Sequence, residues 1–458
     1  MIKKTKHNPG RGKWWLAVFG LCITIGMLPY AVQGAEENDS TLQKVLERMD
    51  AMQKRIDELE QRNQELEKRL ESQEKSYTTQ NERVDSVEGA VNQIETRAVR
   101  SKFGADLYGH FKLDAAYDTS RTDAGNFNRW VISGDDSRND DQFNLTASES
   151  RFGLRFHDAP FGNAVASGRV EVDFYGGGAE NKANPMMRHA YLQLDWPDYD
   201  FSLLAGQTAD VISPLVPSTL NYSVGWWTGN IGYRRPQLQA RKRWNVSETS
   251  SLSLQAALAR TIGDTWGFHP GDTGEDAGFP SMQARLAYTV PLWLKKPVEV
   301  GVSGHWGQEE YDIDRLDHGR DFDSWSMNLD LLLPLMEKLE FKGELWTGEN
   351  LDAYLGGINQ GVNQLLLHEI AATGGWAALS TGPWSKWTFT SGVTIDDPQN
   401  SDLNAGDRTR NMSIFGNAFY AWSEAVQWGL EVSYWDTKYH SKDDGDNVRV
   451  QTSFIYKF

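Results

Sequence analysis

The segment RRPQLQARKRW, residues 234–244, carries polar side chains at alternate positions: Arg235, Gln237, Gln239, Arg241 and Arg243. Alternate side chains of a β-strand lie on one face, so this pattern predicts a strand with one basic, water-facing side. Arg234 has the opposite parity and is expected at the outer rim. A guanidinium holds a carboxylate or phosphate through two parallel hydrogen bonds. The chemistry predicted for this segment is therefore the binding of small anions along a wetted wall.

Further cations lie at inward positions of earlier segments with the same alternation: Lys112, Arg151, Arg155 and Arg169. Carboxylates occur on these segments too: Asp114, Glu149, Glu171 and Asp173. Two interpretations follow. The cations face passing anions, or some of them are paired with acids inside the wall.

The connection QTADVISPLVPSTLNYSVGWWTGNIGY lies directly before the basic strand. It is rich in Pro, Ser, Trp and Gly and lacks strand alternation, which predicts a loop that constricts a channel. Asp210 is expected to face the basic strand across the constriction. Trp226 and Trp227 have two interpretations: they offer an aromatic surface to a sugar ring or an aromatic acid, or they pack the loop against the wall.

Catalytic chemistry finds no support in the sequence. The histidines are scattered, neither HExxH nor GxSxG occurs, and the glycines at 176–178 are too isolated to hold a phosphate. The one cysteine, Cys22, lies in the N-terminal apolar segment, which excludes a disulfide framework or a cysteine-based metal site from the rest of the chain. We predict no enzyme activity, no metal and no cofactor.

The elements that position these residues are β-strands. About sixteen segments after residue 100 alternate apolar and polar side chains, and the connections between them alternate long and short, as in outer-membrane barrels. The composition agrees, with 39% apolar residues but 18 Trp, 16 Tyr and 19 Phe. We predict an all-β transmembrane barrel of about 16 antiparallel strands over residues 100–458. The alternative is a soluble β-sandwich or propeller with its apolar strand faces turned inward.

The final segment, NVRVQTSFIYKF, alternates apolar side chains up to Phe458. A last strand of this kind pairs with the first to close the barrel, and its apolar face then meets lipid. A terminal Phe in this alternation also resembles the signal read by the barrel-assembly machinery. Outer-membrane lipid and that machinery are therefore predicted partners.

Residues 1–34 begin with several Lys and Arg and continue into WWLAVFGLCITIGMLPYAV, followed by Gly34 and Ala35. This order predicts a secretory signal peptide cleaved after Gly34, with a retained membrane anchor as the alternative. No later stretch reaches the roughly 18 apolar residues of a membrane-spanning helix. The formal net charge of −17 argues against nucleic acid as a partner.

Residues 35–99 are predicted to form a parallel coiled-coil stalk, because one heptad register runs from Leu42 for about eight repeats. Arginines at g positions precede glutamates at the following e positions, and such pairs meet only between parallel, in-register chains. The pattern predicts a homo-oligomer and leaves the number of strands open. A solitary amphipathic helix folded on the barrel is the alternative. The a positions include Leu42, Met49, Ile56, Asn63 and Leu70.

The heptads of residues 42–94 and the segments GADLYGHFKLDAAYD, LLAGQTADVISPLVPSTLN, GYRRPQLQARKRW and SFIYKF occur together in this chain. In these features it resembles the DcaP-like trimeric porins. The resemblance implies a homotrimer of sixteen-stranded barrels in the bacterial outer membrane, with a periplasmic coiled coil and a pore for small anions such as dicarboxylic acids. The alternatives are a sugar-selective or general porin, and an envelope-tethering protein that acts through its coiled coil.

Overall fold

The computed structural model describes residues 104–263, 272–294, 296–312 and 319–458, together with helical residues 47, 50, 53–55, 57, 59, 61–70 and 72. The chain divides into two compact units, Met1–Val99 and Arg100–Phe458. The predicted signal peptide and the heptad residues Leu42, Met49 and Ile56 lie outside the described residues.

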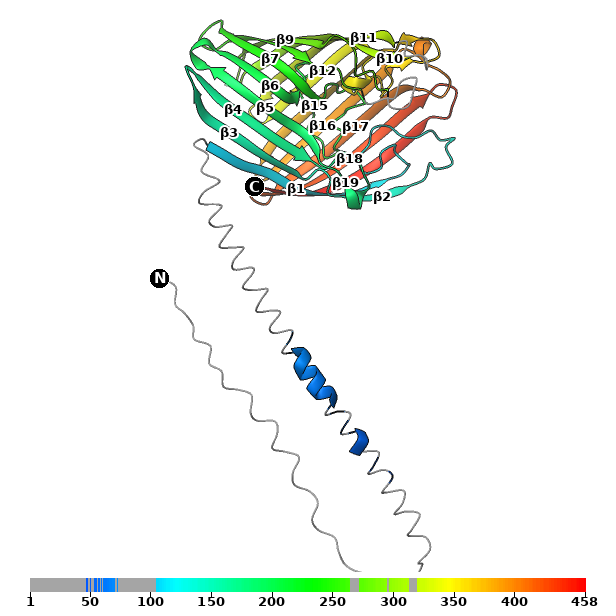
Figure 1. Cartoon of the computed structure of the whole chain (residues 1–458). Helices are drawn as coiled ribbons and strands as arrows, with labels where there is room; N and C mark the ends of the chain where they lie inside the picture. Colours follow the sequence, from blue (N-terminus) through cyan, green and yellow to red (C-terminus); the bar gives the residue numbers. More distant parts are fainter. Residues whose placement is uncertain are drawn as a thin grey trace, which may run out of the picture. The chain divides into compact units, whose positions relative to one another are not determined.

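The second unit is a closed, antiparallel β-barrel (Figure 1). Seventeen strands form its sheet, and β2 and β3 together fill one position, so that the ring has sixteen positions, as predicted. In ring order the strands are β1 (Gly104–Asp118), β2 (Gln142–Thr146) with β3 (Arg151–Phe161), β4 (Ala164–Asp173), β5 (Met186–Trp196), β6 (Phe201–Ala209), β7 (Arg234–Asn245), β8 (Ser251–Ala259), β9 (Ser281–Val290), β10 (Val298–Asp312), β11 (Gly319–Met336), β12 (Leu339–Glu349), β15 (Ala371–Trp384), β16 (Trp387–Pro398), β17 (Arg408–Ala421), β18 (Val426–Tyr439) and β19 (Gly445–Lys457).

The ring closes where β19 pairs with one edge of β1, while β2 and β3 pair with its other edge. Beyond the last strand, the main-chain N–H and C=O of Phe458 exchange hydrogen bonds of 3.1 and 3.0 Å with Gly109. A Cβ on Gly109 would lie 2.1 Å from the carbonyl oxygen of Arg151 of β3, so the close approach of β3 to β1 at this position requires glycine.

The side chains of each strand alternate between an exposed apolar outer face and a polar inner face. On β1, Leu107, Phe111 and Leu113 are 64, 49 and 44% exposed, whereas Lys112 and Asp114 are 4 and 3% exposed. A soluble sandwich or propeller would bury the apolar face, so this arrangement contradicts that alternative and matches a barrel surrounded by lipid.

The connections alternate in length, as predicted. Turns at one end of the barrel are short, for example residues 162–163, 337–338 and 385–386. Connections at the other end include residues 119–141 and 210–233. The remaining short elements are η1 (Glu180–Lys182), η2 (Pro197–Tyr199), η3 (Asp352–Tyr354), β13 (Val362–Asn363), β14 (His368–Glu369) and η4 (Asn400–Asp402).

The described part of the first unit is α-helical, including the whole of residues 61–70. Leu59, Leu66 and Leu70, which occupy a and d positions of the predicted heptad, are 57, 51 and 59% exposed. No helix among the described residues has the length and apolar character that a membrane crossing requires.

Candidate pore and its constriction loops

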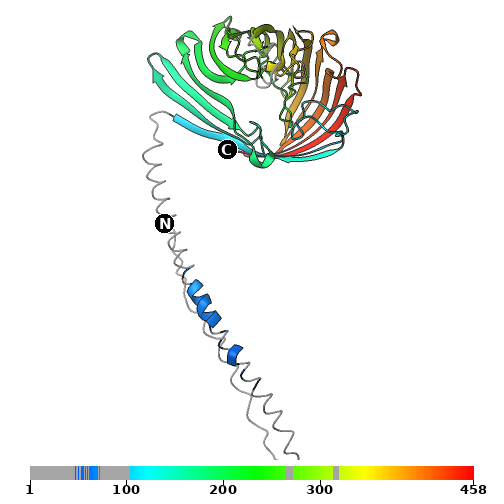
Figure 2. The same ribbon diagram turned by 45° about the vertical axis from the view of Figure 1, so that its right-hand side comes forward.

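The loop of residues 210–233, between β6 and β7, lies inside the barrel (Figure 2). Its main chain hydrogen-bonds to inward side chains of widely separated strands. The N–H of Val211 donates to Gln283 of β9 at 2.8 Å, and the N–H of Leu220 donates to Glu431 of β18 at 2.7 Å. Because these strands are far apart around the ring, the loop crosses the lumen and narrows it.

Two buried carboxylates hold this loop. Glu344 of β12 accepts the N–H of Leu215 at 2.8 Å, and Glu431 accepts a second N–H, from Asn221, at 3.3 Å. Both carboxylates are only 2% exposed. They satisfy main-chain donors that have no strand partner inside the barrel. Part of the polar inner wall therefore serves to anchor the loop.

Trp226 and Trp227 pack among the loops inside the barrel. They are 9 and 6% exposed and form one cluster with Trp130, from the loop of residues 119–141, and with side chains of the loop of residues 350–370. Both tryptophans therefore pack the loops together. Both also line a cavity of about 250 Å³, and Trp226 lines in addition a chamber described below.

Arg235 and Asp210 form a buried ion pair rather than facing each other across an open passage. The Nε atom of Arg235 lies 2.8 Å from Asp210, and both side chains are 1% exposed. The Arg235 guanidinium also stacks 3.8 Å from the ring centre of Tyr354 and donates to the carbonyl of Ala353. The prediction that Arg235 lines the pore and that Asp210 faces it across the constriction therefore does not fit the structure. Arg235 fixes two loops instead.

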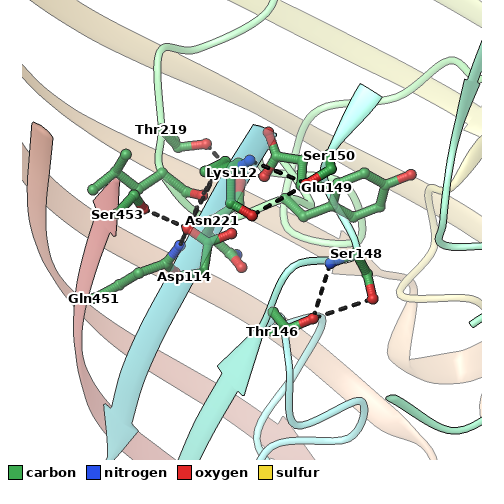
Figure 3. Close-up of polar contacts among 12 residues, drawn as sticks. Lys112, Asp114, Thr146, Ser148, Glu149, Ser150, Thr219, Asn221, Gln451 and Ser453 are labelled. Atoms are coloured by element: carbon green, nitrogen blue, oxygen red, sulfur yellow. Dashed lines mark hydrogen bonds and ion pairs between the residues drawn. The ribbon is translucent and has the colours of Figure 1, made fainter. Parts of the chain in front are cut away.

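Lys112 has a similar anchoring position (Figure 3). It is 4% exposed, pairs with Glu149, which lies between β2 and β3, and lies 3.4 Å from Asp114. Its ammonium also donates to the carbonyl of Leu220 at 2.9 Å. The expectation that Lys112 faces passing solute does not fit this burial. Lys112 ties β1 to the constriction loop.

The inner wall around β3, β7 and β8 carries arginines that remain exposed. Arg155, Arg241 and Arg243 are all exposed, and the guanidinium of Arg155 lies 4.1 Å from the ring centre of Tyr108. Arg241 donates to Ser253 at 3.4 Å. Within the part of the chain that the structure describes, none of the three has a carboxylate at ion-pair distance. Their charge is available to the lumen.

Arg151 and Arg169 are intermediate cases, because they share the buried carboxylate of Glu171. Arg169 forms an ion pair with it, and Nε of Arg151 lies 3.5 Å from it. Tyr108 donates a further hydrogen bond to Glu171 at 2.7 Å. The two arginines are nevertheless 24 and 25% exposed. They are partly neutralised and still accessible.

Arg188 is an inward arginine that the sequence reasoning missed. Between β4 and β5 the register shifts, so that Glu171 faces His189 while Val172 faces Met187. Arg188 is the extra residue of this β-bulge, which turns its side chain inward. There it binds Glu171 at 2.9 Å and Asp173 at 2.6 Å. If alternate residues are counted back along the rest of β5, Arg188 is assigned to the outer face.

Arg234 lies inside the barrel, so its predicted location at the outer rim was wrong. It is 6% exposed, and its guanidinium lies 5.4 Å from the ring centre of Trp226 and 4.8 Å from that of Tyr233. Arg234 is the first residue of β7 and follows directly from the luminal loop. The alternation of the strand therefore does not yet determine its direction.

A chamber of about 320 Å³ separates the constriction loop from this wall. Its charged or aromatic lining consists of Glu149, Arg151, Arg188, His189, Asp210, Tyr222, Trp226, Tyr233 and Arg234. Burial raises the pKa of the loop residue Tyr222 well above its usual range, so this phenol stays neutral. The chamber thus brings together three arginines and three aromatic rings.

Comparison with protein families then decides the assignment. The model of the DcaP outer membrane protein family matches residues 27–268. This chain belongs to that family. It is a channel of the bacterial outer membrane and not an enzyme. No curated protein matches the chain.

Solved structures show the same fold as this DcaP family member. The outer membrane channel DcaP of Acinetobacter baumannii has a TM-score of 0.63 and 19% identity, covering 78% of this chain and 97% of that one. An anion-selective porin from Comamonas acidovorans has a TM-score of 0.50 and 13% identity, covering 78 and 100%. OmpF of Salmonella typhi, in complex with daunomycin, has a TM-score of 0.50 and 12% identity, covering 77 and 97%.

Proposed function

We propose that this channel is a porin for the passive uptake of small hydrophilic anions, dicarboxylates among them. The observation that carries the proposal is the set of exposed inward arginines without a carboxylate partner among the described residues: Arg155, Arg241 and Arg243. The partly exposed Arg151 and Arg169 add to this set. The porin from Comamonas acidovorans, which shares the fold, is itself anion-selective.

The selectivity follows from where the charge lies. Fixed cations along a narrow, water-filled passage raise the local concentration of anions and lower that of cations. The chain as a whole is acidic, with a formal net charge of −17. Acids at a loop tip such as Asp443 are exposed to solvent, where salt screens them beyond about 8 Å at physiological ionic strength. Arginines on the passage wall therefore dominate the field that a solute meets.

The assembly forms part of the same proposal. The chain would reach the periplasm through the signal peptide of residues 1–34, and its C-terminal strand would be recognised by the barrel-assembly machinery. Residues 35–99 would form a parallel coiled coil in the periplasm, with homotrimer formation through Leu42, Met49, Ile56, Asn63 and Leu70. The exposed Leu59, Leu66 and Leu70 support an apolar contact between helices.

The test is a reversal potential measured across a planar bilayer under a salt gradient. We expect the native protein to prefer anions, and the variant with Arg155, Arg241 and Arg243 changed together to Gln to move toward neutrality. A matched control changes Arg260 to Gln, because Arg260 is 57% exposed on the loop after β8 and pairs with Glu275. A cation-selective native channel, or an equal potential in the triple variant, would contradict the proposal.

A sugar-selective pore is the second candidate, and one observation favours it: Tyr222, Trp226 and Tyr233 line the chamber, and aromatic faces stack on sugar rings. Current block by neutral sugars, without any anion preference, would select this candidate.

Deleting residues 40–98 distinguishes transport from a tethering role of the stalk. Conductance should persist if transport is the function, whereas envelope integrity should fail if tethering is.

A further inference from the structure

We propose that Arg234 binds the carboxylate of the permeating solute, and that the chamber around it is a saturable binding site rather than a plain section of pore. The proposal deepens the proposed anion transport and rests on it. It gives to Arg234 the role that strand parity assigned to its neighbour Arg235.

The hydrogen bonding of Arg234 is incomplete in a way that indicates a ligand. Its side chain is 6% exposed, yet Nε and Nη2 are buried and make no hydrogen bond within the described structure. Among the described residues no carboxylate lies at ion-pair distance from it. Buried donors of this kind are normally satisfied, and charged ones most of all. An acceptor from outside the chain therefore completes the site.

The two unsatisfied atoms also define what that acceptor is. Nε and Nη2 form one edge of the guanidinium, and their N–H groups are parallel. This edge fits the two oxygens of a carboxylate in a bidentate contact. A halide ion offers a single centre and cannot use both donors equally well. The geometry favours a carboxylate over chloride.

A second guanidinium supplies another donor to the same space. Arg151 lines the chamber, and its Nε atom, which lies 3.5 Å from the carboxylate of Glu171, is also buried without a hydrogen bond. A carboxylate accepts about four hydrogen bonds through its two oxygens, so both arginines can serve one ligand. The chamber volume of about 320 Å³ is at the small end of ligand pockets, which suits a small organic acid.

The other charged groups that line the chamber are already engaged. Glu149 pairs with Lys112, and Asp210 pairs with Arg235. Arg188 is held between Glu171 and Asp173. Arg151 also lies at ion-pair distance from Glu171. Among the described residues that line the chamber, Arg234 is therefore the arginine without a carboxylate partner, while the carboxylates have their own partners.

Aromatic rings hold the Arg234 side chain in position before a ligand arrives. Its guanidinium lies over Trp226 and Tyr233, at 5.4 and 4.8 Å from their centres, and such cation–π contacts orient an arginine. A group that is already ordered loses less entropy on binding. This preordering favours binding of the carboxylate with a measurable affinity.

The experiment measures the current through single channels in chloride while sodium succinate is added as the probe. The native channel and an R260Q control should show saturation at the same succinate concentration. For R234Q we expect the half-saturating concentration to rise roughly ten-fold or more, as for the loss of one charge-assisted bidentate contact. The half-saturating concentration of R234K should lie between those of the native channel and R234Q, because lysine keeps the charge but not the bidentate contact.

R151Q provides a second variant, with a smaller expected rise, so that the decision does not depend on the folding of R234Q. Heat-modifiable migration on gels verifies that each barrel is folded. A native current that changes linearly with succinate, or an R234Q channel that saturates like R260Q, would overturn the proposal. Failure of anion transport itself would appear separately, as a native reversal potential without anion preference.

Discussion

The two sides of the inner wall are both polar, but their polar residues have different roles. Around β12 and β18 the inward residues, such as Glu344 and Glu431, are buried and hold the main chain of the constriction loop. Around β3 and β7 the inward residues include Arg155 and Arg241, which stay exposed. The difference shows that an inward polar residue lines the passage only where no loop covers it.

Two adjacent residues repeat this contrast on a smaller scale. Arg235 is buried in an ion pair with Asp210, whereas the buried Arg234 has no such partner within the described residues. Both interact with aromatic rings. The first arginine therefore stabilises the structure, and the second remains available to a ligand.

The largest effect is expected in stability, and it separates a buried arginine of β7 from an exposed one on the same strand. Changing Arg235 to Ala leaves Asp210 as an unpaired buried charge, which costs about 3–5 kcal/mol. Changing the exposed Arg241 to Ala should alter the free energy of unfolding by no more than about 0.5 kcal/mol. Denaturant unfolding in lipid vesicles, followed by tryptophan fluorescence, measures both. Equal losses would show that the contrast between buried and exposed arginines is mistaken.

A smaller effect is expected when an anchor of the loop is removed. Changing Glu431 to Ala leaves the N–H groups of Leu220 and Asn221 without their acceptor, at a cost of about 1–3 kcal/mol. The loop should then fluctuate, which would appear as noise in the single-channel current. E431Q keeps one acceptor oxygen, so its single-channel current should be less noisy than that of E431A.

The control for this anchor is E340A. Glu340 is 30% exposed and pairs with Lys342 at 3.1 Å, so its removal should cost about 0–1 kcal/mol without added noise. If E340A and E431A are equally noisy, the carboxylates on the loop-covered side do not hold the loop in the way described.

The smallest effect concerns one exposed arginine. Changing Arg155 to Gln should lower the anion-to-cation permeability ratio roughly two-fold at 0.1 M salt, where the Debye length is about 10 Å, and have no effect at 1 M, where it is about 3 Å. Reversal potentials at the two salt concentrations measure this. An effect that persists at 1 M salt would indicate that Arg155 contacts the ion directly.

The sequence predicted the barrel well because alternation is a local property. Strand parity also placed Arg241 on the inner face, and its side chain is exposed. Prediction from the sequence failed where the outcome depends on distant or irregular structure. Nothing local indicates that Asp210 pairs with Arg235, and the β-bulge that turns Arg188 inward leaves no mark in the strand pattern. Arg234 was misassigned because parity does not hold at the first residue of a strand that follows a luminal loop.

The seam between β1 and β19 bears on the order in which the barrel folds. Asp114 and Ser453, which hydrogen-bond across it, are 339 positions apart, so this pairing is the most costly in chain entropy and is expected to form late. Both strands of the seam also bind the constriction loop, since Lys112 and Gln451 each donate to the carbonyl of Leu220 at 2.9 Å. Those two anchors form together only when the ring closes. The folding step that seals the barrel is therefore also the step that completes the narrowing of its channel.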